Sequence, residues 1–198
     1  MALIQIDSFK ELFNVGVGQA AGILNQMVGT NIKLEVPDLE IIRQKRNLEN
    51  IEIINKEVLS AIEEKFEGVF SGKAILAFPL RSASRLVSLL IGEEIGSPDL
   101  NSAMIGTITE VGNILINALL GTIGNIFKAK LTLSFPHHFK GFGIDLIDIE
   151  EETPQEFVII ICKTRFSAEK LQIIGYFFLI IETQAMERLL SAMDKKME

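Results

Sequence analysis

The sequence predicts an α/β fold, built from a helix–strand–hairpin–helix unit that occurs twice. Three observations predict it. The 198 residues, 48% of them hydrophobic, are enough for one substantial core or two small ones. Long helix-like stretches alternate with short apolar stretches of strand length, and their order is the same in both halves. We therefore expect a single domain over residues 1–198 with internal repeats at about 1–97 and 98–198, related by a pseudo-two-fold axis.

The elements of the first half follow from their pattern and their end signals. Gly29 and the residues after it are typical of a helix stop, and Pro37 is expected to end the short alternating strand before it. A polar segment without clear pattern runs to about Asn55. The expected elements are a helix from Asp7 to about Gly29, a strand over Ile32–Val36, strands over about 58–66 and 69–78 joined across Glu67-Gly68 as a hairpin, and a helix over Ser82–Ile91.

The second half repeats this order. Ser97-Pro98-Asp99 is a typical helix start, and Pro136 again follows a short strand. The expected elements are a helix over about Asp99–Lys128, a strand over Lys130–Phe135, strands over Glu156–Phe166 and Leu171–Ile181, and a helix from about Gln184 to Lys195. We expect the strands of both halves to form one mixed or antiparallel sheet, with the two long helices beside it.

A shift of 99 residues brings the two halves into register. Between residues 11 and 37 it gives five identities, where chance would give about two. The identical pairs are Glu11 and Glu110, Asn14 and Asn113, Gly22 and Gly121, Leu34 and Leu133, and Pro37 and Pro136. Internal duplication is therefore the expectation.

Composition excludes several classes of function. The chain carries 19 Lys and Arg against 26 Asp and Glu, and its net charge of −7 disfavours nucleic acid and anionic lipid as partners. One cysteine excludes a disulfide framework and a multi-cysteine metal site. The charge-free stretches 12–32 and 111–127 contain Asn residues that are costly in hydrocarbon, and the N-terminus does not resemble a signal peptide. We expect a soluble, cytoplasmic protein without membrane insertion.

Each long helix carries a polar stripe. At 100° per residue, Asp7, Glu11 and Asn14 share one face of the first helix. A similar face of the second helix carries Glu110 and Asn113, followed by Asn117. Most neighbouring residues are small or apolar, so another surface could approach these side chains closely. The stripes are the candidate functional sites.

Structural explanations of the stripes stay open at this point. Ser8-x-x-Glu11 and Thr107-x-x-Glu110 both fit a capping box, in which the acid only satisfies the start of a helix. The Asn residues could be buried and bonded to the backbone. Asn is, however, a poor residue inside a helix, and a Glu followed by Asn three residues later occurs in both halves.

Other motifs carry no recognisable chemistry. Gly16-Val-Gly18 lies within a helical pattern and lacks the context of a dinucleotide or phosphate loop. His137 and His138 lack acidic or cysteine ligands at zinc spacing and are expected in a loop. Cys162 is expected to be an inert core thiol. The acidic stretch 145–152 is a solvated strand end or loop, or else a docking surface.

A family resemblance gives the stripes a function. Asp7-x3-Glu11-x2-Asn14-x22-Pro37 and Glu110-x2-Asn113-x22-Pro136 resemble the paired signature of the CheC/CheX/FliY family, most of all that of its CheC members. The resemblance implies a CheC-like single domain that hydrolyses the aspartyl phosphate of a CheY-type response regulator in chemotaxis, a form of two-component signalling. One departure is Gly106, because the family has Ser or Asp four residues before the Glu.

The resemblance also implies roles for these residues. Asn14 and Asn113 would orient the hydrolytic water, while Glu11 and Glu110 would pair with the receiver's lysine, and Asp7 would help at the first site. An acyl phosphate already has a good leaving group, so positioning a water is the main task left. No metal or cofactor of the chain's own is expected, and Mg²⁺ is expected in the partner receiver domain.

The expected partner is a CheY-type response regulator, with a CheD-type deamidase as a further possibility, and we expect the chain to act as a monomer. The alternatives are a non-catalytic CheC-like adaptor that binds a regulator or CheD, and a component of the flagellar switch. A phosphatase of small molecules is disfavoured, because no cluster of Lys or Arg adjoins either stripe in the sequence.

Overall fold

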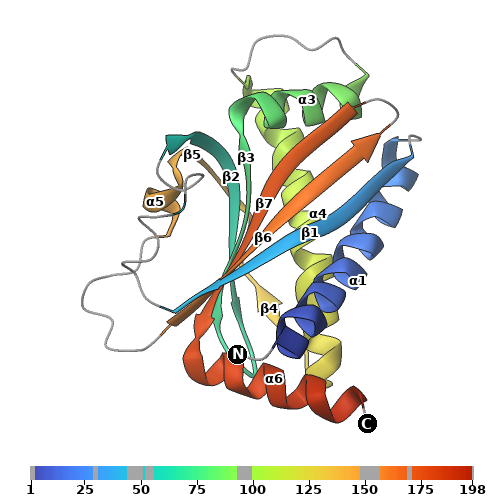
Figure 1. Ribbon diagram of the computed structural model, residues 1–198. Coiled ribbons are helices and arrows are strands. Elements are labelled where there is room, and N and C mark those ends of the chain that lie inside the picture. The colour runs from blue at the N-terminus through green and yellow to red at the C-terminus, as the bar shows by residue number, and fades with distance from the viewer. Residues whose placement is uncertain are drawn as a thin grey trace.

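The computed structural model describes residues 3–28, 31–43, 51, 56–92, 100–147, 157–168 and 171–197. A seven-stranded antiparallel sheet forms its centre, and two long helices, α1 (Leu3–Val28) and α4 (Ser102–Phe127), run along one face (Figure 1). Figure 1 shows the shorter helices α3 (Leu80–Ile91) and α6 (Thr183–Met197) at opposite ends of the sheet. All four helices contribute to one apolar core on this face.

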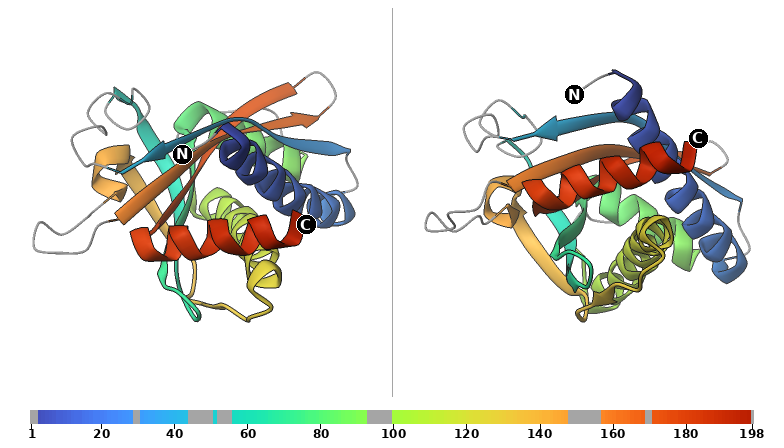
Figure 2. Two further views of the ribbon diagram at one scale, coloured as in Figure 1. Left: turned by 60° about the horizontal axis from the view of Figure 1, so that its bottom comes forward. Right: turned by 90° about the horizontal axis from the view of Figure 1, so that it is seen from below.

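The strand order is β1-β6-β7-β3-β2, and β2 then pairs with both β4 and β5. Figure 2 shows this arrangement from two other directions, with α1, α4 and α6 close together on the helical side. A smaller apolar cluster lies on the opposite face, where α5 (Gly143–Leu146) packs. The strands are β1 (Ile32–Ile42), β2 (Val58–Glu67), β3 (Gly72–Pro79), β4 (Thr132–Leu133), β5 (His137–Phe142), β6 (Phe157–Ala168) and β7 (Leu171–Glu182).

The predicted fold class is confirmed, with all strand pairs of the sheet antiparallel. Helix, strand, hairpin and helix follow one another twice along the chain. Each half also pairs its first strand with the hairpin of the other half, since β1 lies beside β6 while β4 and β5 lie beside β2. This exchange agrees with an internal repeat, and the repeat and the domain division stay predictions.

The predicted ends of two strands are wrong. β1 continues through Pro37 to Ile42, and its register with β6 shifts between Glu35 and Asp38. Proline is tolerated there because β1 is an edge strand and the irregularity removes the need for a ladder N–H. β4 covers only Thr132–Leu133 of the strand predicted over Lys130–Phe135, and after Pro136 the chain pairs with β2 again as β5. Pro37 thus lies within one strand, whereas Pro136 lies between two strands that pair with the same neighbour.

Three further boundaries differ from the prediction. The first helix begins at Leu3 rather than Asp7. The second begins after Asn101, whose side chain accepts a hydrogen bond from the Met104 amide at 3.0 Å, as an N-cap residue does. β3 begins at Gly72 rather than Val69, so the hairpin loop covers residues 68–71.

The outcomes for the remaining motifs are mixed. His137 and His138 lie in β5 and not in a loop, and His138 Nε2 is 2.9 Å from Ser60 Oγ. Cys162 is buried, as predicted, and burial raises the pKa of its thiol. The start of the acidic stretch 145–152 lies in α5, and residues 148–152 lie outside the described residues.

Within the part of the chain that the structure describes, α4 is long and apolar enough to cross a membrane by length and composition alone. Its apolar residues have partners in the core, where Ile108, Leu115 and Leu119 are fully or almost fully buried. Gly16 allows α1 to approach α4 very closely, because a Cβ added there would lie 2.9 Å from Leu119 Cα. We therefore interpret α4 as a core helix.

This close approach predicts that the same substitution changes stability by different amounts at two glycines of α1. Replacing Gly16 by valine is expected to force the helices apart and lower the free energy of unfolding by about 2 kcal/mol more than Gly22→Val does. A Cβ at Gly22 meets nothing within 4 Å, which makes it the matched control. Urea denaturation of both variants measures the difference, and equal changes would contradict the packing.

Candidate functional site

The predicted stripe of α1 lies on its solvent side. Asp7, Glu11 and Asn14 are all exposed. The opposite side of the helix is buried against the sheet and α4 through its apolar residues, namely Phe9, Leu12, Phe13, Val17, Ala20 and Leu24. Glu11 lies two turns inside the helix, because α1 begins at Leu3, so it does not form a capping box at the helix start.

Asn14 links α1 to β1. Its side-chain Oδ1 accepts a hydrogen bond of 2.9 Å from the backbone N–H of Val36, in the irregular stretch just before Pro37. The register shift frees this N–H from the strand ladder, and Asn14 supplies the missing acceptor. The side chain is thus bonded to the backbone but not buried, and its amide N–H groups remain able to donate.

The stripe of α4 is similarly placed but differently bonded. Glu110 and Asn117 are exposed and Asn113 is half-buried. The Asn117 side-chain amide donates to Asn113 Oδ1 at 2.6 Å and to the Asn113 carbonyl at 2.8 Å. Glu110 lies in the middle of the helix, so the capping-box explanation fails here as well.

Among the described residues, no side chain takes the place of the one that is missing at Gly106. This glycine is exposed, and an added Cβ would meet nothing within 4 Å. The neighbouring hydroxyls of Thr107 and Thr109 donate to the carbonyls of Ala103 at 3.1 Å and Ile105 at 2.7 Å. Both threonines thus bond to their own helix, and neither takes the place of a side chain at residue 106.

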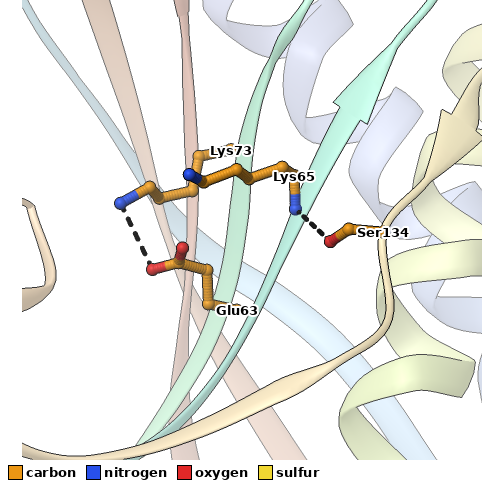
Figure 3. A network of polar contacts seen from close by, with 4 residues as sticks. All are labelled: Glu63, Lys65, Lys73 and Ser134. Atoms are coloured by element: carbon orange, nitrogen blue, oxygen red, sulfur yellow. Dashed lines mark hydrogen bonds and ion pairs between the residues drawn. The ribbon is translucent and has the colours of Figure 1, made fainter.

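The strand beside the second stripe differs from the strand beside the first. The shift of 99 residues places Phe135 at the position of Val36, yet Phe135 is 95% exposed and Val36 only 4%. Ser134 holds the chain to β2 at this point, because its N–H donates to the Lys65 carbonyl at 2.8 Å and its Oγ accepts from the Lys65 N–H at 2.9 Å (Figure 3).

A buried carboxylate lies on β2 on the side that faces the helices. Glu64 is 1% exposed and shares its side of the strand with Ile62 and Phe66, two residues of the helical core. Gly112 of α4 packs directly on Ile62, since an added Cβ would lie 2.6 Å from Ile62 Cβ. Glu64 therefore lies on the face of β2 that α4 covers.

Neither carboxylate oxygen of Glu64 has a hydrogen-bond partner among the described residues. Burial raises its pKa from 4.5 to about 7, because an ionised carboxylate is costly away from water. The sequence analysis missed this residue. A signal was present, since alternation along the predicted strand over about 58–66 puts Glu64 on the same side as Ile62 and Phe66.

A groove of about 360 Å³ adjoins the second stripe, between α4 and the chain that follows it. Asn117 and Gly121 line one side, and the exposed Lys128 and Lys130 line the other. The structure thus brings two lysines beside the stripe, contrary to the expectation from the sequence. Within the described ranges, no three His, Cys, Asp or Glu side chains lie together as a metal site would require.

Part of the chain is similar in sequence to a known protein. No protein-family model matches the chain. The chain is 26% identical to the CheY-P phosphatase CheC of Bacillus subtilis (strain 168) over 138 residues, which are 67% of this chain and 64% of CheC. The matched part is therefore slightly under two thirds of the length of this relative.

Solved structures share the fold over nearly the whole chain. FliY of Thermotoga maritima has a TM-score of 0.78 at 15% identity, covering 99% of this chain and 98% of FliY. The FliM middle domain of H. pylori has a TM-score of 0.67 at 9% identity, covering 97% and 99%. The CheX–CheY–BeF3–Mg²⁺ complex of Borrelia burgdorferi has a TM-score of 0.51 at 21% identity, covering 88% and 98%. The chain is thus similar in sequence to CheC and shares its fold with FliY, FliM and CheX.

The different bonding of the two Asn residues predicts different effects on stability. Asn14→Ala removes the acceptor of the Val36 N–H and is expected to lower the free energy of unfolding by about 1 kcal/mol. Asn113→Ala is the matched control and is expected to change it by less than about 0.5 kcal/mol, because its bonds are to its own helix. Urea denaturation measures both, and equal losses would refute the link to β1.

Burial of Glu64 predicts a dependence of stability on pH. Its folded pKa, about 7, lies above its ordinary value of 4.5, so the folded state binds the proton more tightly. Below about pH 4.5 both states are protonated and the residue carries no penalty. As the pH rises from about 4.5 to 7 the stability falls, and above pH 7 the loss levels off at about 3 kcal/mol.

Glu64→Gln should therefore be more stable than the parent protein at pH 8 and nearly equal to it at pH 5. Unfolding curves across this range provide the measurement. Glu63→Gln is the control, since Glu63 is partly exposed and pairs with Lys73 at 3.2 Å (Figure 3). A gain at pH 8 that appears equally in the Glu63 variant would contradict the assignment to burial.

Proposed function

We propose that this chain, a relative of CheC in sequence and of FliY and CheX in fold, dephosphorylates the aspartyl phosphate of a CheY-type response regulator. The observation that carries the proposal is a Glu and an Asn, one turn apart, at the surface of both long helices, where Glu11, Asn14 and Glu110 are exposed and Asn113 is half-buried. Each pair lies on a helix whose other side is fixed in the core. The protein would act in the cytoplasm, in chemotaxis signalling.

In this proposal Asn14 and Asn113 orient the hydrolytic water in the receiver's phosphorylation site. A carboxamide can donate to a water and accept from it, which suits it to this task. Glu11 and Glu110 would pair with the receiver's lysine and fix the pose, and the exposed Asp7 would assist at the first site. Neither glutamate pairs with a cation within the described part of the chain, so both are available to a visiting protein.

The partner would supply the rest of the chemistry. An acyl phosphate has a good leaving group, and a Mg²⁺ ion in the receiver would offset charge on the phosphoryl oxygens. The similar CheX is found in a complex with CheY, BeF3 and Mg²⁺, which supports a receiver as partner. Placing a water in line with phosphorus is then enough for a large acceleration, because most of the remaining activation free energy of hydrolysis comes from positioning that water.

The two sites are expected to contribute unequally. Asn14 Oδ1 already accepts from the Val36 amide, and releasing it would leave a backbone N–H without a partner. Within the described part of the chain, Asn113 Oδ1 accepts only from the exposed Asn117 side chain, and water can replace that donor. Asn113 can thus turn toward a water more easily, although Gly106 leaves its site without a supporting side chain.

Decay of the phosphorylated regulator tests the mechanism. The double variant Asn14→Ala, Asn113→Ala is expected to lose at least about 100-fold of the acceleration, leaving decay near the regulator's own rate. Binding of the regulator should change by less than about threefold, because the glutamates and the surrounding surface remain. Unchanged acceleration in the double variant would remove the mechanism.

The single variants rank the two sites. Asn113→Ala is expected to lower the rate of decay more than Asn14→Ala, once both are measured well below their unfolding temperatures. Asn117→Ala is a useful third variant, because it removes the bond to Asn113 without touching either candidate pair. A larger loss in Asn14→Ala would reverse the proposed ranking.

The fold of FliY and FliM favours a second candidate function, a non-catalytic adaptor or flagellar-switch component. Such a protein would bind a regulator or a CheD-type deamidase and sequester it. Turnover distinguishes the two, since an enzyme releases many phosphates per chain and an adaptor protects or removes at most one. Binding of CheD and the monomeric state stay predictions.

A further inference from the structure

Phe135 is far more exposed than any other large apolar residue in the described part of the chain. It is 95% exposed, whereas the other exposed ones, such as Val15 and Phe142, lie between 37% and 45%. A fully solvated phenyl ring forgoes the roughly 2 kcal/mol that burial would provide. Single exposed apolar residues are common, but an aromatic ring with almost no contact to its own protein is suited to contact another.

The backbone around Phe135 is held in place. Two hydrogen bonds hold Ser134 to Lys65 of β2. The Ser134 N–H donates to the Lys65 carbonyl, and the Ser134 Oγ accepts from the Lys65 N–H, which is the bond drawn in Figure 3. On the other side Pro136 restricts the chain, and β5 resumes pairing with β2 at His137. The ring therefore projects from a fixed point, which reduces the entropy lost when it binds.

Phe135 lies at the second candidate site. Its counterpart in the first half, Val36, donates its N–H to Asn14, so this position adjoins the Asn of its helix. In the second half, Gly112 of α4 packs on Ile62, and Ile62 pairs with His138, three residues after Phe135. Leu133, two residues before Phe135, lines the same groove as Asn117, and Asn117 is bonded to Asn113, so the exposed ring lies near the second stripe.

We propose that Phe135 is an aromatic anchor by which the second site docks the receiver domain of the phosphorylated regulator. The inference rests on the proposed function and names a binding residue, not a catalytic one. The ring would enter an apolar depression next to the phosphorylated aspartate. The surface is continuous with the Glu110–Asn113 pair, so one docking event would engage both.

Charge around the anchor fits the same partner. Lys65 lies on the adjacent strand, and Lys128 and Lys130 precede β4, all three exposed in a chain whose net charge is −7. Glu67, opposite Thr132, is an exposed acid on the same edge, and Glu63 is already paired with Lys73. The excess of cations suits the carboxylates and phosphoryl group that surround a receiver's phosphorylation site.

Steady-state kinetics with the phosphorylated regulator test the proposal. Phe135→Ser is expected to raise KM at least tenfold and to leave kcat within about twofold, because the anchor binds the partner without touching the reacting atoms. Phe135→Leu should recover most of the loss. Phe142→Ser, at the far end of β5 and 44% exposed, is the matched control and should leave KM unchanged. Unfolding curves check that the exposed substitutions leave the fold intact.

Three outcomes would overturn the anchor: an unchanged KM in Phe135→Ser, an equal rise in the Phe142 control, or a loss confined to kcat. Sedimentation of the same variants tests whether Phe135 instead joins two copies of this chain. In that case Phe135→Ser would weaken self-association while KM stayed constant. Failure of the proposed function is separate. If the parent chain binds the regulator loaded with BeF3 and Mg²⁺ but does not accelerate decay of the phosphorylated regulator, the phosphatase proposal is refuted. The effect of Phe135→Ser on the Kd for the loaded regulator then still tests the anchor.

Discussion

Burial of one side of α1 and one side of α4 against the same face of the sheet determines where both candidate sites lie. A helix that places Phe9, Phe13 and Val17 in the core has little freedom to rotate, since each buried side chain contributes roughly 1.5–3 kcal/mol. With 3.6 residues per turn, Glu11 and Asn14 must then face outward. The orientation of the site is thus set by residues that never touch a partner.

Much of this arrangement could be predicted from the sequence because it depends on periodicity. The stripes, the two hairpins and the two long helices all follow from local alternation of apolar and polar residues. The effect of the prolines on strand ends could not be predicted from local pattern. A proline ends a central strand but is tolerated in an edge strand, and which strand lies at the edge depends on the assembled sheet. His137 and His138 were misplaced for the same reason, since β5 exists only through pairing with β2, far away in the sequence.

The spacing between Asn14 and Pro37 now has a physical explanation. The Asn14 side chain accepts from Val36, 22 residues along the chain and immediately before the proline. A proline and a register shift at this point leave one N–H outside the ladder, and the helix supplies its acceptor. The sequence showed the offset, but the bond itself depends on how α1 packs against β1. Glu64 was missed because its burial likewise depends on α4 above it, which local composition does not reveal.

The two candidate sites differ in the backbone of the strand beside the helix. In the first half the strand stays continuous past its proline, Val36 is buried, and Asn14 is bonded to it. In the second half the strand is broken into β4 and β5, and Ser134 takes the hydrogen bonds that hold the chain to β2. Residue 135 then has no need to face the core, so a large aromatic ring can occupy it and point into solvent. Among the described residues, Asn113 bonds to Asn117 of its own helix and not to a strand, so the exposed ring and an Asn that is free of the sheet occur in the same half.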